Sequence, residues 1–193
     1  MIHVQSIVGS VRDGRAGEAV ARWFTSLAGS RSDMTHETLD LRDWDLPLEM
    51  SPKPPIMGDY IGETSRRWAE KIATADAFVL ITPEYNHGYP APLKNALDHI
   101  FHEWNRKPVG FVGYGGAGGG IRAVEQLRQV VIELEMAPLR HQVTIPAVYR
   151  AFDQDGQLLD PGNGQAAGKL LDEIVWWGTA LRGARASSLQ LSA

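Results

Sequence analysis

The chain contains no cysteine among its 193 residues. This absence excludes a disulfide framework, a thiol nucleophile and any metal site built from thiolates. The sequence also lacks an apolar run near the roughly 20 residues that cross a membrane, and it does not begin with a basic segment followed by a small-residue cleavage site. We therefore expect a cytoplasmic protein whose chemistry does not use cysteine.

A strong excess of charge of one sign is missing as well, because the net charge is -4 with 22% charged residues. Nucleic-acid binders usually carry a basic field that releases counterions from phosphates, so we expect no nucleic-acid partner. A length of 193 residues with 44% hydrophobic residues suits one domain over residues 1–193 with one sizeable core. Because the chain has no basic field, any phosphate-binding site should be confined to a few residues.

Apolar periodicity predicts strands that alternate with helices along the chain. We expect strands at residues 2–8, 36–41, 77–81, 109–114 and 139–148. We expect helices at residues 15–28, 58–75, 92–103, 121–136 and 166–181, and an extended proline-rich loop at 42–57. Because parallel strands need crossover connections, this alternation predicts an α/β fold, a flavodoxin-like doubly wound five-stranded parallel sheet of order 2-1-3-4-5 with helices on both faces.

In such a sheet, ligands bind outside the carboxyl ends of the strands, near the switch point between strands 1 and 3. The first loop there, residues 9–17, reads GSVRDGRAG and matches neither the P-loop pattern nor the GxGxxG fingerprint. Its glycines, the following helix N-terminus, Ser10, Arg12 and Arg15 nevertheless predict a cradle for one phosphate. The alternative is that Ser10 only caps the turn and the arginines are solvated.

Two further loops fall at the same rim. Residues 82–90 read TPEYNHGYP, and Tyr85, His87 and Tyr89 supply flat surfaces that could line a planar ring or pack within a rigid turn. Residues 115–120 bring up to five glycines to a helix N-terminus, where bare N–H groups would stabilise a ring that gains negative charge on reduction. The alternative for this third loop is a flexible linker.

A phosphate cradle and a planar-ring site on one rim together predict bound flavin mononucleotide, FMN. In flavin chemistry a hydride moves to the ring atom N5, while the protein supplies position and electrostatics. We therefore assign no side chain a catalytic role.

The stretches GSVRDGRAG, PEYNHGYPAPLKNALDHI and KPVGFVGYGGAGGGIRAVEQLR resemble the NADPH-dependent FMN reductases, a family that includes azo-dye, quinone and chromate reductases. The resemblance covers about residues 2–148, and PEYN followed by LKNALD is its most specific part. It implies a flavodoxin-like enzyme that binds FMN, takes hydride from NADPH or NADH, and forms homodimers or dimers of dimers.

The same resemblance assigns residues to the cofactor. The FMN phosphate would be held by Ser10, Arg12, Arg15, Ala16 and Gly17. The isoalloxazine ring would be lined by Pro83, Glu84, Tyr85 and Asn86, and bounded on its other side by Tyr114, Gly115 and Gly116. Many members of the family have Ser and Asn at the positions of Arg15 and Gly17, so we expect charge and backbone to hold more of the phosphate here.

The helix expected at residues 92–104 would lie at the dimer interface, with Ile100, Phe101 and Trp104 as candidate contacts. His99, His102 and Glu103 also lie there at helical spacing, which is compatible with a metal site. No carboxylate cluster completes such a coordination shell, so we expect no metal.

These observations predict an FMN-dependent NAD(P)H oxidoreductase that passes hydride to quinone, azo, flavin or metal-ion acceptors. NAD(P)H and the acceptor would use the same exposed flavin face in turn, which gives ping-pong kinetics. One alternative is an electron carrier or redox-responsive flavin-binding protein without NAD(P)H turnover, although carriers are usually more acidic. Another keeps the fold but binds a different nucleotide or a sugar phosphate.

Overall fold

The protein is described by a computed structural model that covers residues 1–191 of the chain and the side chains of residues 1–187. Residues 192–193, the end of the domain predicted over 1–193, lie outside the described part. No helix within residues 1–191 has the length and apolar character needed to cross a membrane. The cytoplasmic location stays a prediction.

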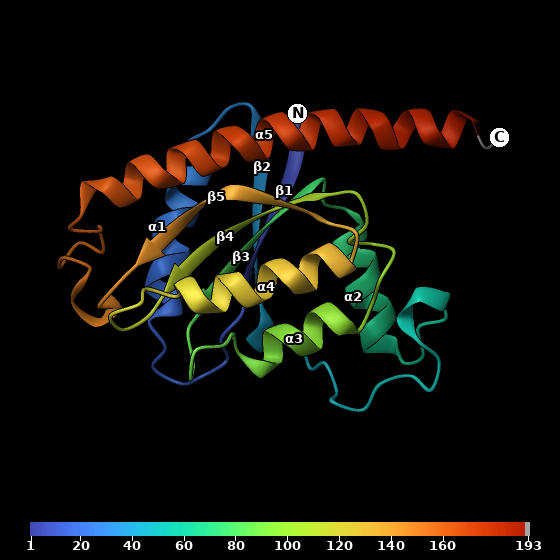
Figure 1. Cartoon of the computed structure of the whole chain (residues 1–193), viewed down its shortest axis with the longest axis horizontal. Helices are drawn as coiled ribbons and strands as arrows, with labels where there is room; N and C mark the ends of the chain where they lie inside the picture. The colour runs from blue at the N-terminus through green and yellow to red at the C-terminus, as the bar shows by residue number, and fades with distance from the viewer. Residues whose placement is uncertain (192–193) are drawn as a thin grey trace.

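A five-stranded parallel sheet of order β2-β1-β3-β4-β5 forms the centre of the molecule (Figure 1). The strands are β1 (Ile2–Val8), β2 (Met34–Asp40), β3 (Ala77–Pro83), β4 (Pro108–Tyr114) and β5 (Ala137–Ile145). Strands β3 and β4 are buried along their whole length, as expected for central strands covered on both faces. The predicted flavodoxin-like fold class is confirmed.

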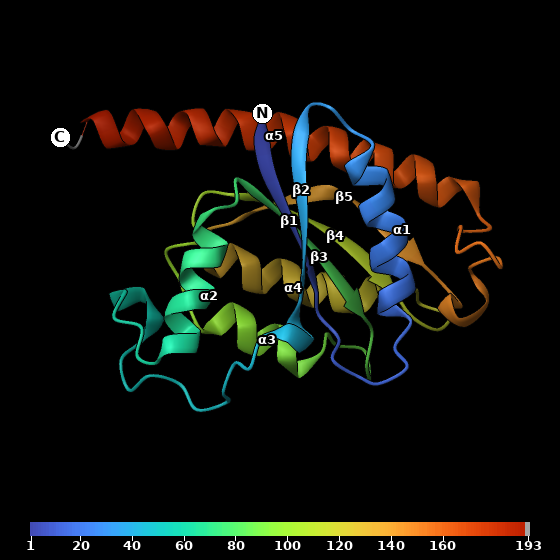
Figure 2. The same cartoon turned by 180° about the vertical axis from the view of Figure 1, so that it is seen from behind.

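Helices cover both faces of the sheet and give the molecule two apolar cores (Figures 1 and 2). One core lies beneath α1 (Gly17–Gly29) and α5 (Pro161–Leu191). The other lies beneath α2 (Glu63–Ala73), α3 (Ala91–Asp98) and α4 (Ile121–Glu133). The sheet therefore lies between two layers of helices, and only the loops at the ends of its strands remain open to a ligand.

Three helices differ most from their predicted bounds, and the first, α2, begins at Glu63, five residues after the predicted start at 58. Helix α3 ends at Asp98, five residues before the predicted end at 103. The chain turns there because Trp104 packs edge-on against Trp68 and Phe78 in the core, with centroid distances of 6.2 and 4.9 Å. Helix α5 instead starts earlier and ends later than the predicted 166–181, and its C-terminal end extends beyond the sheet (Figure 1).

The strand β5 begins at Ala137 and includes Pro138, whereas the sequence predicts a start at Leu139. Proline cannot donate to a strand ladder, but β5 lies at the edge of the sheet and its outer side needs no partner. The ladder with β4 is also irregular between Val109 and Phe111. This edge position explains why Pro138, expected to stop a helix, can also lie within a strand.

Candidate functional site

The loops that follow β1, β3 and β4 meet at the carboxyl end of the sheet, as the sequence predicts. The Gly9 N–H donates to the Ile81 carbonyl over 2.9 Å, which joins the first loop to β3. The Glu84 N–H donates to the Tyr114 carbonyl over 3.0 Å, which joins the second loop to the start of the third. The predicted site residues therefore come together on one rim.

Ser10, Arg12 and Tyr85 form the contact between the first two loops. The Ser10 Oγ and the Tyr85 hydroxyl are hydrogen-bonded at 2.8 Å, and Ser10 is fully buried. The Arg12 guanidinium lies 4.5 Å from the centre of the Tyr85 ring, within cation–π range. Among the described side chains no carboxylate forms an ion pair with Arg12, so its charge is available to an anion at this turn.

Arg15 has a different position. Its side chain is 2% exposed and forms an ion pair with Asp40 at the end of β2. The guanidinium also donates to the Ser10 carbonyl, so that it crosses beneath the turn. Arg15 therefore braces the turn with its side chain.

Gly17 and Tyr114 lie against each other below the turn. Gly17 is the first residue of α1, and a Cβ atom there would collide with the Tyr114 hydroxyl. Tyr114 is 3% exposed, and burial raises the pKa of its hydroxyl above the usual value. This hydroxyl has no hydrogen-bond partner among the described residues. The Tyr114 hydroxyl thus lies against the end of the first loop. That Tyr114 also bounds the ring, as the family resemblance implies, stays a prediction.

Glu84 connects the second loop to the helix that follows the third. Its Oε1 accepts a hydrogen bond from Nε of Arg122 at 2.5 Å, and its Oε2 accepts one from the Arg122 backbone N–H at 3.1 Å. Burial by itself would raise the pKa of Glu84, but the bonds from Arg122 outweigh it and the pKa lies below its ordinary value. Glu84 is therefore an anion paired with the first turn of α4.

The tip of the second loop is a tight turn. Tyr85 and Gly88 exchange backbone hydrogen bonds of 2.8 and 3.0 Å, while Asn86 and His87 adopt left-handed φ angles of 51° and 69°. Residues other than glycine seldom adopt this conformation. Pro83, the last residue of β3, is buried and leads directly into Glu84. The backbone of the second loop is thus held in one shape.

The glycine loop, residues 115–120, leaves part of its backbone open. A Cβ atom at Gly116 would meet nothing within 4 Å, so the backbone there faces free space. Gly120 has a φ of 88°, and a Cβ atom there would collide with the backbone of Tyr114. The loop therefore combines an exposed residue, Gly116, with a conformation at Gly120 that only glycine permits.

Asp40 and Arg122 are site residues that the sequence reasoning missed. Asp40 ends the strand beside β1, and a carboxylate at that point could have been recognised as a partner for Arg15. Arg122 follows the glycine loop in the first turn of a helix, but nothing local in the sequence indicates which carboxylate it meets.

The residues weighed as metal ligands are engaged elsewhere. The His99 Nε2 lies 2.8 Å from the Pro47 carbonyl oxygen, and the His102 Nε2 lies 2.9 Å from the Ile56 carbonyl oxygen. Glu103 accepts a hydrogen bond of 2.7 Å from the Tyr60 hydroxyl. All three side chains therefore fasten the 42–62 segment to the α3 region.

The predicted partner contacts need a correction. Ile100 and Trp104 are fully buried in this chain's own core, so neither offers surface to another chain, and that part of the prediction is wrong. Phe101 is partly exposed and lines an open cavity of about 440 Å³ together with Met50 and Ile56. Any contact with a second chain in this region would therefore involve Phe101 and the neighbouring loop.

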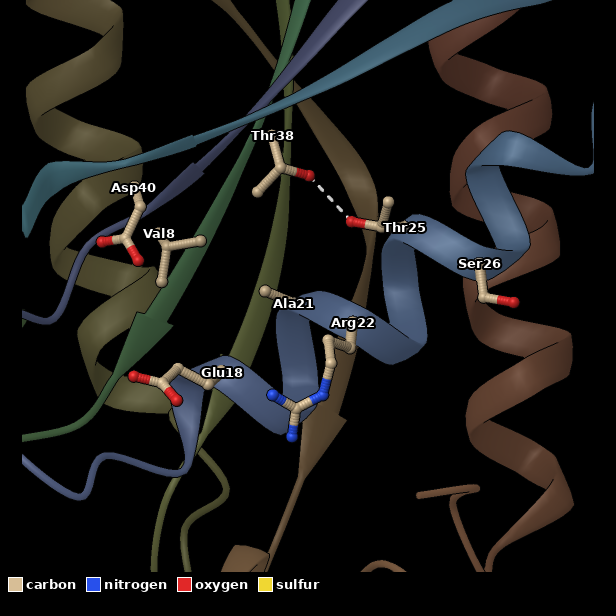
Figure 3. Close-up of a pocket in the computed structure, with 8 residues that line it drawn as sticks. All are labelled: Val8, Glu18, Ala21, Arg22, Thr25, Ser26, Thr38 and Asp40. Carbon is tan, nitrogen blue, oxygen red and sulfur yellow. Dashed lines mark hydrogen bonds between the residues drawn. The ribbon is translucent and has the colours of Figure 1, made fainter. Parts of the chain in front are cut away.

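A separate cavity of about 640 Å³ lies between α1 and β2 (Figure 3). Its walls are formed by Val8, Glu18, Ala21, Arg22, Thr25, Ser26, Thr38 and Asp40. The hydroxyls of Thr25 and Thr38 are hydrogen-bonded to each other at 2.7 Å. None of the predicted cofactor residues lines this cavity, but Asp40, the partner of Arg15, forms part of its wall.

The doubly wound sheet, with three loops that meet at the carboxyl end of its strands, defines a protein of the flavodoxin-like class. The model of the NADPH-dependent FMN reductase family matches residues 2–149, and the chain belongs to that family. Membership confirms the predicted family, the class of enzyme, the cofactor FMN and the co-substrate NAD(P)H.

Individual relatives agree with this family. The chain is 45% identical over 144 residues to an NAD(P)H-dependent FMN reductase of Schizosaccharomyces pombe, a match that covers 72% of each chain. It is 32% identical over 173 residues to an FMN-dependent NADPH-azoreductase of Staphylococcus haemolyticus, covering 88% of this chain and 91% of the relative. The flavoenzyme FerB of Paracoccus denitrificans shares the fold, with a TM-score of 0.69 and 23% identity over 93% of this chain and 98% of that one.

Proposed function

We propose that the protein passes hydride from NAD(P)H through bound FMN to small-molecule acceptors of the quinone, azo, flavin or metal-ion type. The observation that carries this proposal is the meeting of three loops, linked by the Ser10–Tyr85 and Glu84–Tyr114 hydrogen bonds, on one rim of a family member's sheet. The azoreductase among the relatives supports an acceptor of this kind.

The residues at the rim fit FMN. Ser10, Arg12 and the backbone of Arg15, Ala16 and Gly17 would hold the phosphate, because this turn pairs an available guanidinium with the N-terminus of α1. The ring would lie against the backbone of Pro83, Glu84, Tyr85 and Asn86 on one side, and of Tyr114, Gly115 and Gly116 on the other. The open backbone at Gly116 and the uncommitted charge of Arg12 are the features of this chain that the cofactor would satisfy.

When bound, FMN supplies a ring that accepts and returns a hydride. The chain's own contribution is to hold that ring between two rigid loops and to place N–H groups where negative charge develops. Since residues 1–191 form one sheet with one such rim, we propose that NAD(P)H and the acceptor occupy it in turn, in a ping-pong mechanism. Steady-state kinetics in both substrates should give parallel double-reciprocal lines, and intersecting lines would contradict the shared site.

We also propose that the protein forms a homodimer, or a dimer of dimers, through the 92–104 region. Large apolar side chains are exposed on the adjacent loop, among them Leu48, Ile56 and Met57 at 81%, 57% and 64%. Ile56 and Phe101 line the cavity of about 440 Å³, and Met57 follows Ile56 directly in the chain. Such a patch is typical of an interface between protein chains.

The decisive experiment is reconstitution of the purified protein with FMN, followed by NADPH oxidation at about 340 nm with a quinone, an azo dye or ferricyanide. We expect a flavin spectrum and turnover that depends on added FMN. The Arg12→Gln variant should bind FMN more weakly, while Arg22→Gln, at the separate cavity, should match the unsubstituted protein. FMN binding without NADPH oxidation would favour an electron carrier, and absence of FMN binding would favour another phosphate ligand.

A further inference from the structure

Glu84 holds both ends of the glycine loop. Its backbone N–H bonds to the carbonyl of Tyr114, the residue before the loop, at 3.0 Å. Its carboxylate bonds to the backbone N–H and the guanidinium of Arg122, two residues after the loop. One residue of the second loop thus sets the distance between the entry and the exit of the third.

The ion pair between Glu84 and Arg122 also lies next to Gly118 in the glycine loop. A Cβ atom at Gly118 would stand 2.7 Å from an Arg122 guanidinium nitrogen and 3.5 Å from the Glu84 Oε1. The Glu84 side chain is 7% exposed, whereas that of Arg122 is 48% exposed. The negative member of the pair is therefore fixed in the protein, and the positive member lies at the surface of the rim.

Electrostatics gives the two members opposite effects on a ring held there. Reduced FMN carries more negative charge than oxidised FMN, so a nearby cation favours the reduced form and a nearby anion opposes it. The charges of Glu84 and Arg122 partly cancel, and neither acts at full strength while the pair is intact.

We propose that the Glu84–Arg122 pair positions the glycine loop and balances its charge, with Glu84 opposing and Arg122 favouring the negative charge that the flavin gains on reduction. Glu84 is then a positioning residue that acts through Arg122 and the loop rather than by touching the ring with its carboxylate. This inference rests on the proposed function, namely on FMN bound at this rim.

The test is the flavin reduction potential, measured by equilibration with a reference dye at pH 8 in FMN-loaded protein. Glu84→Gln retains the shape of the side chain but leaves the Arg122 charge uncompensated, so the potential should rise. Arg122→Gln leaves the buried Glu84 carboxylate uncompensated, so the potential should fall. We expect each change to alter the ratio of affinities for reduced and oxidised FMN severalfold, where tenfold corresponds to about 30 mV for a two-electron couple.

Two further variants separate charge from shape. Arg122→Lys keeps the charge but loses the forked hydrogen bonds, so it should weaken FMN binding while the potential stays near that of the unsubstituted protein. The double substitution of Glu84 and Arg122 by Gln should restore a potential close to the original, because no net charge is left exposed. Matched controls are Asp33→Asn and Arg31→Gln. They break the ion pair between Asp33 and Arg31, which lies just before the start of β2, away from the three-loop rim.

Opposite shifts for the two single variants, with near cancellation in the double variant, would support the inference. Shifts in the same direction, or none, in variants that still bind FMN would overturn it and would leave the proposed function intact. Failure of the unsubstituted protein to bind FMN would overturn the proposed function and this inference together.

Discussion

The ion pair between Arg15 and Asp40 leads to a quantitative prediction about the first loop, residues 9–17. In Asp40→Asn the Arg15 guanidinium, only 2% exposed, loses its nearest ionic partner but keeps its hydrogen bond to the Ser10 carbonyl and its ion pair of 3.5 Å with Glu18. Breaking a fully buried pair costs about 3–5 kcal/mol. Because the Asp40 side chain is 28% exposed and Asn can still accept a hydrogen bond, we expect a smaller loss of about 2 kcal/mol.

A loss of that size should lower the melting temperature by about 4–8 °C in a chain of this length. The same substitution should loosen the turn. If about half of the 2 kcal/mol is also lost from phosphate binding, the Kd for FMN rises about fivefold. Riboflavin has the same ring and no phosphate, so its Kd should change little, and the FMN-to-riboflavin affinity ratio isolates the turn.

Calorimetry of unfolding and titration calorimetry with both flavins measure these quantities. The matched control is Asp33→Asn, because the pair of Asp33 with Arg31 is exposed and an exposed pair contributes about 0.5 kcal/mol. The reasoning is refuted if Asp40→Asn is no more destabilising than the control, or if it weakens FMN and riboflavin binding equally.

Three other predictions follow from the structure. Burial lowers the pKa of His36 from 6.5 to about 4, so protonation favours the unfolded chain; stability to urea should be fully present above pH 6.5 and decline as pH falls toward 4, and His36→Gln should flatten that decline. Gly17→Ala should cost about 1–3 kcal/mol through collision with the Tyr114 hydroxyl, and adding Tyr114→Phe should recover most of that loss in thermal unfolding, whereas an unchanged loss would contradict the contact. Met57→Asp should shift the protein from dimer toward monomer in light scattering while leaving its melting temperature nearly unchanged, and a dimer of undiminished stability would place the interface elsewhere.

Most of the fold could be predicted because its signals are local. Strand β1 matches its predicted bounds, and the apolar run at 77–81 marks β3 as a central strand. The alternation of strands and helices then fixes the parallel sheet and gathers the three loops at one rim. The composition of those loops, together with the family resemblance, was enough to predict a site for FMN.

What could not be predicted depends on contacts between distant residues. Apolar spacing extends the α3 pattern past residue 98, but the packing of Trp104 on Trp68 and Phe78 ends the helix. Likewise, Arg122 follows the glycine loop in the sequence, and only the folded chain brings the Glu84 carboxylate to it. Side-chain partners across the sheet follow from tertiary geometry, which a linear pattern does not contain.

The close contact between Gly17 and Tyr114 also constrains how this chain could have diverged. Any side chain at position 17 would need the space that the tyrosine hydroxyl fills here. A lineage could acquire such a side chain only after position 114 had become smaller, so the order of the two mutations matters. Positions 97 residues apart in the chain are therefore expected to change together when sequences of this family are compared.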